Sequence, residues 1–347
     1  MEKEFEEKPF SKGFSSNILF RYNYSMPTLA HFLDGVIVKD GSAYQGLWIF
    51  PVCLILPEAD TAADEPLTLE EGLKTGGIAV YETGAMDRAR IVNQTAQRAV
   101  VLDGETLLGG AQNRIVNAGS IIPAGREVEL PSSCVEVHRW DCVRDKKNPI
   151  PEDKKNFIRC DFGFGSLRRL KMAEAVHSLR SDREVRVDQK KVWEHIVRQF
   201  GFSGASTKTL DLHDLYEFWD SAMQLFPPRF PVKRQQVGLI AFQDRDNWFL
   251  DLFADRGILY KYVRKIVRGH AFDTLIRIER ELIVPASKKP TLDDARSALK
   301  SIKLAPAHKF RVGGASAGEN MFFATGRLQG AAVLSDDALI HLAACSM

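Results

Sequence analysis

The spacing of apolar residues changes once along this chain of 347 residues, and that change limits the folds available to it. From residue 30 to residue 140, short apolar or alternating runs are separated by Gly, Asp and Asn. Runs of this length between turn residues predict β-strands. The clearest of them are 35–39, 46–52, 77–81, 98–102 and 127–130. Several short strands with regular turns favour a sandwich or a barrel-like sheet.

Helical periodicity replaces this pattern beyond residue 155. Apolar residues there recur at intervals of three and four, as on one face of an amphipathic helix. The expected helices are 167–180, 188–200, 210–226, 257–275 and a short one after Thr291. Two apolar hairpins are also expected: 237–253 follows the third helix, and 330–344 closes the chain. One earlier helix, near 67–73, begins at the capping-box pattern Thr68-x-x-Glu71.

These patterns predict an α+β protein. A β-rich N-terminal unit, a sandwich or barrel-like sheet, is expected to pack with a helical second half that two β-hairpins close. The expected divisions are an N-terminal extension 1–26, a β-rich domain 27–145, a loop 146–165 and an α+β domain 166–347. The last hairpin has too little apolar surface to be stable alone, so the two parts should pack together.

Composition narrows the class of protein. Apolar and charged fractions of 45% and 27% are those of an ordinary soluble globular protein. A net charge of +2 gives no bulk attraction to nucleic acid or to an anionic membrane. Five scattered cysteines without a CxxC pair fit a reducing cytosol. The sequence therefore predicts a cytoplasmic protein with no membrane or nucleic-acid partner, and it leaves the oligomeric state open.

The segment 103–117 carries an unusual density of polar side chains among apolar ones. Its candidate site residues are Glu105, Gln112, Asn113, Arg114 and Asn117. Read functionally, this is a ligand-binding loop, because an arginine can grip a phosphate or carboxylate bidentately and amides bind polar edges. Read structurally, it is a bulged loop in which an Arg–Glu pair and the amides satisfy backbone groups.

A second polar cluster occupies 134–140. On a strand, Cys134, Glu136, His138 and Trp140 would share one face. A Cys/Glu/His row is also compatible with a metal site or an activated thiol, but ligands two residues apart on one strand lie far from each other. We therefore interpret Cys134 as a core residue and His138 as a surface residue. Glu136, Arg139 and Trp140 stay as site candidates, because a ring beside a guanidinium can stack a planar ligand.

The other motifs indicate no specific chemistry. The sequence contains no P-loop, Rossmann fingerprint, GxSxG elbow or HExxH. Asp161-Phe-Gly-Phe-Gly is interpreted as a turn, and the basic helix around 261–268 as a solvated face. Asp251 and His341 occupy matching places in the two hairpins.

Several motifs together resemble a known family. They are Asp103-Gly-Glu, Gly-Ala-Gln-Asn-Arg-Ile-Val-Asn117, Ile122-Pro-Ala-Gly125, Ser133-Cys-Val-Glu, Arg139-Trp140, Gln189-x-x-Val-Trp193 and Ala271-x-Asp273. This combination resembles the ADP-ribosylglycohydrolase- and rhodanese/phosphatase-associated protein family over about 35–343. The resemblance implies neighbours that act on NAD-derived nucleotides and ADP-ribose, an inference from association.

Two functions follow as hypotheses. In the first, the protein binds or processes an NAD-derived nucleotide or ADP-ribose-like ligand, with hydrolysis as one form of processing. Arg114 and Arg139 would bind phosphates, Trp140 would stack the base, and Glu105 or Glu136 would act as general base or divalent-metal ligand. The sequence leaves the cofactor open, and a divalent metal is compatible with these carboxylates. In the second, the same residues form a structural polar network in a non-catalytic binding or scaffold module.

Overall fold

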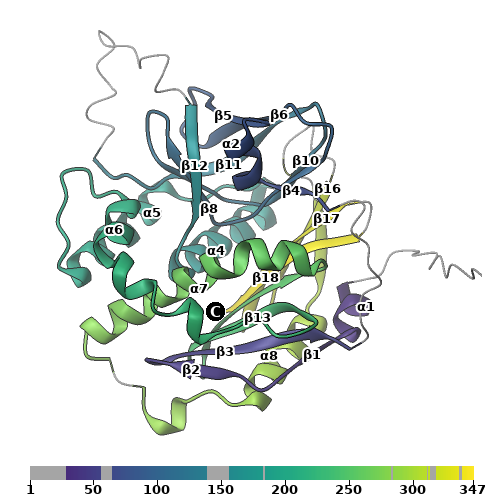
Figure 1. Ribbon diagram of the computed structural model, residues 1–347, viewed down its shortest axis with the longest axis vertical. Coiled ribbons are helices and arrows are strands. Elements are labelled where there is room, and N and C mark those ends of the chain that lie inside the picture. Colours follow the sequence, from purple (N-terminus) through teal and green to yellow (C-terminus); the bar gives the residue numbers. More distant parts are fainter. Residues whose placement is uncertain are drawn as a thin grey trace, which may run out of the picture.

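The computed structural model describes residues 29–55, 65–138, 156–182, 184–282, 284–310, 312, 318–335 and 338–347. The expected extension 1–26, the polar segment 144–155 and two predicted ligand-binding residues, Arg139 and Trp140, lie outside these ranges. The fold is α+β, as the sequence predicts (Figure 1). No helix of the described part is long and apolar enough to cross a membrane.

A closed six-stranded barrel forms one end of the molecule, with the strand order β11-β6-β5-β12-β8-β9 (Figure 1). Its strands are β5 (Ile78–Glu82), β6 (Arg88–Asn93), β8 (Glu105–Gly109), β9 (Arg114–Val116), β11 (Glu127–Cys134) and β12 (Asn156–Phe162). β9 pairs with β11 and closes the barrel. In β6, Ala89 and Ile91 are buried whereas Arg90 is exposed, which is the period-two alternation of a strand with one face inside. The barrel-like expectation is confirmed.

A nine-stranded antiparallel sheet forms the other end, with the path β1-β3-β13-β14-β18-β17-β16-β15 and β2 paired to β3. Its strands are β1 (Val36–Val38), β2 (Ser42–Tyr44), β3 (Leu47–Leu54), β13 (Gln236–Asp244), β14 (Asn247–Phe253), β15 (Ala307–Phe310), β16 (Gly318–Ala324), β17 (Leu328–Ser335) and β18 (Ala338–Ser346). Both expected hairpins are confirmed, as β13–β14 and β17–β18. A small third sheet contains β10 (Ser120–Ile122), β7 (Ala99–Val101) and β4 (Leu67–Thr68).

Helices cover both faces of the large sheet. The helices of the described residues are α1 (Leu29–Asp34), α2 (Leu69–Thr75), α4 (Gly165–Asp182), α5 (Gln189–Ser203), α6 (Leu212–Met223), α7 (Arg256–Glu279) and α8 (Leu292–Lys303), with short 3-10 turns η2 (Pro227–Arg229) and η3 (Ala286–Lys288). Of these, α2 packs against β5 and β12 of the barrel instead of the large sheet. Leu239 packs with the helices α4 to α7, whereas its neighbour Ile240 packs with α8. β13 is therefore apolar on both sides because each side meets helices.

The expected helices are present, and both capping boxes are confirmed. Thr68 and Glu71 exchange hydrogen bonds at the start of α2, and Thr291 and Asp294 do so at the start of α8. Each box satisfies backbone N–H groups that the first helical turn leaves without partners.

Strand pairing links the two parts that the sequence separates. β12 lies within the segment expected to be a loop, and it pairs with β5 and β8 in the barrel. Its register shifts between Phe157 and Arg159, so buried and exposed residues do not alternate simply along it. That bulge explains why period two is not visible in the sequence. From the N-terminal side, β3 pairs with β13 of the large sheet.

Helix α4 joins the barrel to the large sheet through two buried cations. The Arg168 guanidinium donates to both carboxylate oxygens of Asp251, at 2.9 and 2.7 Å, and lies between the rings of Phe162 and Phe249. The second Asp251 contact is His341 Nε2, at 3.0 Å. Burial alone would raise the pKa of Asp251, but Arg168 and His341 outweigh it and hold that pKa well below its usual range.

The second cation is Lys171, one turn further along the same helix. Its Nζ donates to Asp103 Oδ1 of the barrel at 2.8 Å and to the Val116 carbonyl, and its side chain is fully buried. Burial lowers the pKa of Lys171, and Asp103 opposes that effect. α4 thus makes one charged contact with each sheet system, which is why its buried face is not purely apolar.

We predict that Asp251→Asn lowers the free energy of unfolding at pH 7 by ~3–5 kcal/mol, because it leaves the buried Arg168 charge without a counter-ion. Urea unfolding followed by circular dichroism measures the loss. Asp246→Asn, in the exposed turn of the same hairpin, is the control, because its ion pair with Lys288 lies at the surface and should contribute at most about 1 kcal/mol. Equal losses in the two variants would contradict this assignment.

Candidate functional site

The first polar segment forms β8, a tight loop and β9 at the barrel wall. Gly109 and Gly110 have φ values of 112° and 63°. A Cβ added at Gly109 would lie 2.9 Å from the Asn156 carbonyl oxygen of β12. Glycine is required at this position because the loop passes close to the neighbouring strand with left-handed backbone.

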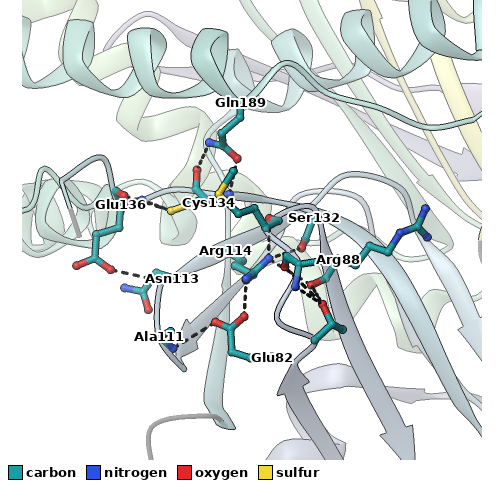
Figure 2. Close-up of polar contacts among 12 residues, drawn as sticks. Glu82, Arg88, Ala111, Asn113, Arg114, Ser132, Cys134, Glu136 and Gln189 are labelled. Atoms are coloured by element: carbon teal, nitrogen blue, oxygen red, sulfur yellow. Dashed lines mark hydrogen bonds and ion pairs between the residues drawn. The ribbon is translucent and has the colours of Figure 1, made fainter. Parts of the chain in front are cut away.

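Arg114 is buried inside this wall, and its hydrogen bonds and its ion pair within the described part of the chain are with residues other than Glu105 and Glu136. Its guanidinium pairs with Glu82 and donates to the carbonyl oxygens of Met86, at 2.7 Å, and Arg88, at 3.2 Å (Figure 2). These acceptors belong to the hairpin of β5 and β6, so the barrel itself satisfies the charge. Sequence reasoning did not identify Glu82, because it lies 32 residues from Arg114.

Gln112 and Asn117 of this segment are also buried. The Asn117 amide donates to Ser133 Oγ at 2.9 Å, across the β9–β11 pair. Gln112 is 2% exposed, and its Oε1 has no hydrogen-bond partner among the described residues. Asn117 therefore has a structural partner, whereas Gln112 keeps one unsatisfied acceptor, which is costly in a buried position.

The two polar segments meet at Asn113 and Glu136. The Asn113 backbone N–H donates to Glu136 Oε2 at 3.4 Å (Figure 2). The Asn113 side-chain amide donates to Asp211 Oδ2, and Asp211 forms an isolated β-bridge with Glu136. Asn113 thus contacts two carboxylates that are 3% and 7% exposed. The sequence indicates Asn113 and Glu136, and it gives no sign of Asp211, which lies 98 residues away.

Asp211 has the electrostatics of an acid that titrates near neutral pH. Burial raises the pKa of Asp211 to about 7; the hydrogen bond from His213 N–H opposes the rise, and the nearby Glu136 adds to it. Asp211 is also the N-cap of α6, where its Oδ1 accepts from His213 N–H at 3.2 Å. Two carboxylates in different environments can divide the roles of acid and base between them.

Cys134 and His138 follow the interpretation made from the sequence. Both backbone polar groups of Cys134 bond the Gln189 side chain at 2.8 Å (Figure 2). Burial raises the pKa of the Cys134 thiol to about 11, so it stays protonated and unreactive at neutral pH. His138 is exposed.

Glu105 is fully buried between the barrel and α7. Its Oε2 accepts from Leu102 N–H at 2.8 Å, and Tyr262 and Lys265 approach the same carboxyl group. Burial raises the pKa of Glu105 to about 7, against the opposing charge of Lys265. Lys265 Nζ lies 2.6 Å from Glu70 and 3.9 Å from Cys160 Sγ. Glu105 therefore lies on the interior side of Lys265, away from solvent.

Lys265 opens onto a cavity of about 660 Å³ between β12, α6 and α7, which we name the α6–α7 groove. Its charged lining consists of Arg159, Lys261, Arg264, Lys265 and Arg268, with Glu70, Asp161, Glu217 and Asp220. Lys261, Lys265 and Arg268 are ion-paired with carboxylates. Arg159 and Arg264 are exposed and form no ion pair with any described residue.

His213 borders the same groove. It is 6% exposed, and its Nε2 has no hydrogen-bond partner among the described residues. Burial lowers the pKa of His213 to about 3, so the ring is neutral at pH 7. Sequence reasoning missed the groove because five separate segments build it. Its one visible signal, the basic helix 261–268, is also typical of a solvated face.

Metal ligands are limited at these positions. Within the described ranges, no group of three His, Cys, Asp or Glu side chains could hold a metal ion. Glu136 and Asp211 supply two carboxylates that approach each other.

We predict that Glu136→Gln lowers the pKa of Asp211 from about 7, because it removes the like charge that helps to raise it. Carbon-detected NMR of the side-chain carboxyl groups measures the titration. Asp214→Asn is the control, because Asp214 raises the same pKa by less. A larger shift in the control would contradict the pairing.

The same shift has a consequence for stability. The raised pKa means that native Asp211 holds a proton between about pH 4 and 7, whereas the unfolded chain has released it. Asp211 therefore makes the wild-type protein lose stability as pH rises through this window, by about 1.4 kcal/mol per pKa unit. Glu136→Gln should make that slope shallower.

Comparison with known proteins gives one match. The family model of the ARG and Rhodanese-Phosphatase-superfamily-associated Protein domain matches residues 35–345. No curated protein and no solved structure matches the chain.

Proposed function

Because the chain belongs to the ARG and Rhodanese-Phosphatase-superfamily-associated Protein domain family, we propose that it binds or processes an NAD-derived nucleotide or ADP-ribose-like ligand. We interpret ARG in the family's description as ADP-ribosylglycohydrolase, an enzyme that acts on ADP-ribose compounds. The observation that carries the proposal is the α6–α7 groove, where Arg159 and Arg264 face a cavity of about 660 Å³ without carboxylate partners.

The groove suits the phosphates of such a ligand. Small-molecule sites commonly have volumes of about 300–1,000 Å³. Arginine binds phosphate bidentately, and the three ion-paired cations would add favourable charge without leaving an uncompensated cluster in the free protein. The neutral His213 ring offers a hydrogen bond at the groove wall.

Acid–base chemistry would come from Glu136, which the sequence indicates, and from Asp211, which meets it in the structure. Asp211 begins α6, and the groove runs along that helix past His213 and Glu217. In this proposal Glu136 is the general base and Asp211, which titrates near neutral pH, is its acid partner. Glu70 pairs with Lys265 at the groove wall, and the buried Glu105 adds an attractive charge behind it.

A scaffold module is the second candidate, and burial of the first segment favours it. Glu105, Arg114 and Asn117 are all at most 5% exposed, and Arg114 and Asn117 find their partners inside the barrel. On this alternative the polar residues stabilise the barrel and the groove binds no nucleotide.

We predict that ADP-ribose raises the melting temperature of the wild-type protein, and that Arg159→Gln/Arg264→Gln weakens its binding at least tenfold, about 1.4 kcal/mol. Calorimetric titration measures the affinity, and thermal shift at a hundredfold excess over Kd should show about 2.7 kcal/mol of added stability. Both substitutions are at exposed positions, so the fold should be retained.

Arg327→Gln is the matched control, because Arg327 is also an exposed arginine but lies just before β17, in the large sheet. Adenosine and inorganic pyrophosphate separate the contributions of the base and of the phosphates. If neither ADP-ribose nor NAD binds the folded wild-type protein, the scaffold alternative holds. Binding that survives the double substitution would place the ligand elsewhere.

A further inference from the structure

A second cavity, of about 230 Å³, lies where β12 passes into α4. It shares no lining residue with the α6–α7 groove. Its polar lining includes Ser166 and Asp273, and Phe202, Phe249 and Ile276 are among its apolar side chains. The remaining polar and charged lining residues are Arg169, Gln199, Gln243, Asn247, His270, Arg277 and Arg280. We name it the Ser166 pocket. A small cavity with apolar walls and a few convergent polar groups has the composition of a ligand site.

Ser166 is held between a carboxylate and an imidazole. Its Oγ lies 2.6 Å from Asp273 Oδ1 and 3.1 Å from His195 Nε2. The Ser166 N–H also donates to Asp273 Oδ2, at 2.8 Å. The hydroxyl has one hydrogen and two groups within reach that can accept it, which is the neighbourhood of an activated nucleophile.

The backbone keeps this hydroxyl accessible from the pocket. Ser166 is the second residue of an 18-residue helix that follows a strand after a turn of two residues. At the preceding residue, Gly165, an added Cβ would lie 2.7 Å from His270 Nδ1 and 2.9 Å from Asp273 Oδ2. The absence of a side chain therefore lets the His270 ring line the pocket beside Asp273.

His270 is itself a buried polar group without a full set of partners. The residue is 4% exposed, and its Nε2 has no hydrogen-bond partner among the described residues. Burial lowers the pKa of His270 to about 4, so the ring is neutral at pH 7 and one of its nitrogens carries a hydrogen. A neutral imidazole at the wall can donate a hydrogen bond to a carbonyl oxygen or to an oxyanion.

We propose that Ser166 is a nucleophile toward esters of small acyl groups, at a site separate from the α6–α7 groove. In the first step Oγ bonds to the ester carbonyl carbon and its proton passes to the Asp273 carboxylate. The bond from that carbon to the alcohol oxygen breaks, and the alcohol leaves with the proton. Water then attacks the acyl-serine, which releases the acid and restores the hydroxyl.

Charge and space agree with this assignment. Burial raises the pKa of Asp273 to about 6, so it is ionised at pH 7 and basic enough to accept a proton. The cavity has room for a short acyl chain against Phe202 and Ile276. The motif Gly163-Phe-Gly-Ser166 is not a GxSxG elbow, and this explains why sequence reasoning passed over it.

The simpler alternative is that Asp273 only caps α4 through Ser166. Both alternatives place the same hydrogen bonds, but they differ in reactivity. A serine that only caps the helix forms no covalent adduct with an ester.

The test is the reaction of the full-length protein with p-nitrophenyl acetate at pH 7.5. We expect a burst of one equivalent of p-nitrophenolate and an acetyl group on Ser166, located by peptide mass spectrometry. Ser166→Ala should abolish the burst and lower turnover at least a hundredfold. The control Ser181→Ala, at an exposed position of the same helix, should leave both unchanged.

Circular dichroism confirms that each variant is folded. Should Ser166→Ala unfold, the acetylation map of the wild-type protein still decides the matter. A folded wild-type protein with no acetyl group on Ser166 would overturn the proposal, and so would an equal burst from Ser166→Ala. Neither result bears on nucleotide binding in the α6–α7 groove.

Discussion

The buried pair of Arg168 and Asp251 is the interaction on which the arrangement of the molecule depends. Placing two charges in a protein interior costs several kcal/mol per ion unless geometry and further hydrogen bonds offset it. Here the contact is bidentate, His341 adds a third contact, and two aromatic rings flank the guanidinium. Lys171 repeats the arrangement toward the barrel. α4 is therefore fixed to both sheet systems, and β12, which leads into it, is fixed with it.

That anchoring has consequences for both cavities. β12 supplies Arg159 to the α6–α7 groove, and Ser166 follows the end of β12 by four positions. α7 then separates the two, because its residues between 261 and 268 line the groove and its residues between 270 and 277 line the pocket. One helix thus lines a cationic site and a serine-centred site at different positions along its length. Rigid elements hold such groups more closely than loops do.

Local patterns in the sequence were enough to predict most helices and hairpins, but not the strand β12 or the long-range partners of the site residues. The capping boxes at Thr68 and Thr291 and both hairpins were predictable, because turn and cap chemistry is written within a few residues. The site was predictable only in part: Asn113 and Glu136 do meet, but Asp211 joins them from the second half of the chain. Periodicity and short motifs report a residue's neighbours in sequence, so a carboxylate 98 residues away leaves no trace in them.

The central claim is that the phosphates of an ADP-ribose-like ligand bind in the α6–α7 groove. A crystal structure of the full-length protein with ADP-ribose tests it most directly. We expect electron density for the two phosphates within hydrogen-bond distance of the guanidinium groups of Arg159 and Arg264, with His213 at the groove wall. Density for the ligand at another place on the protein, or an empty groove at a saturating concentration of ADP-ribose, would contradict it.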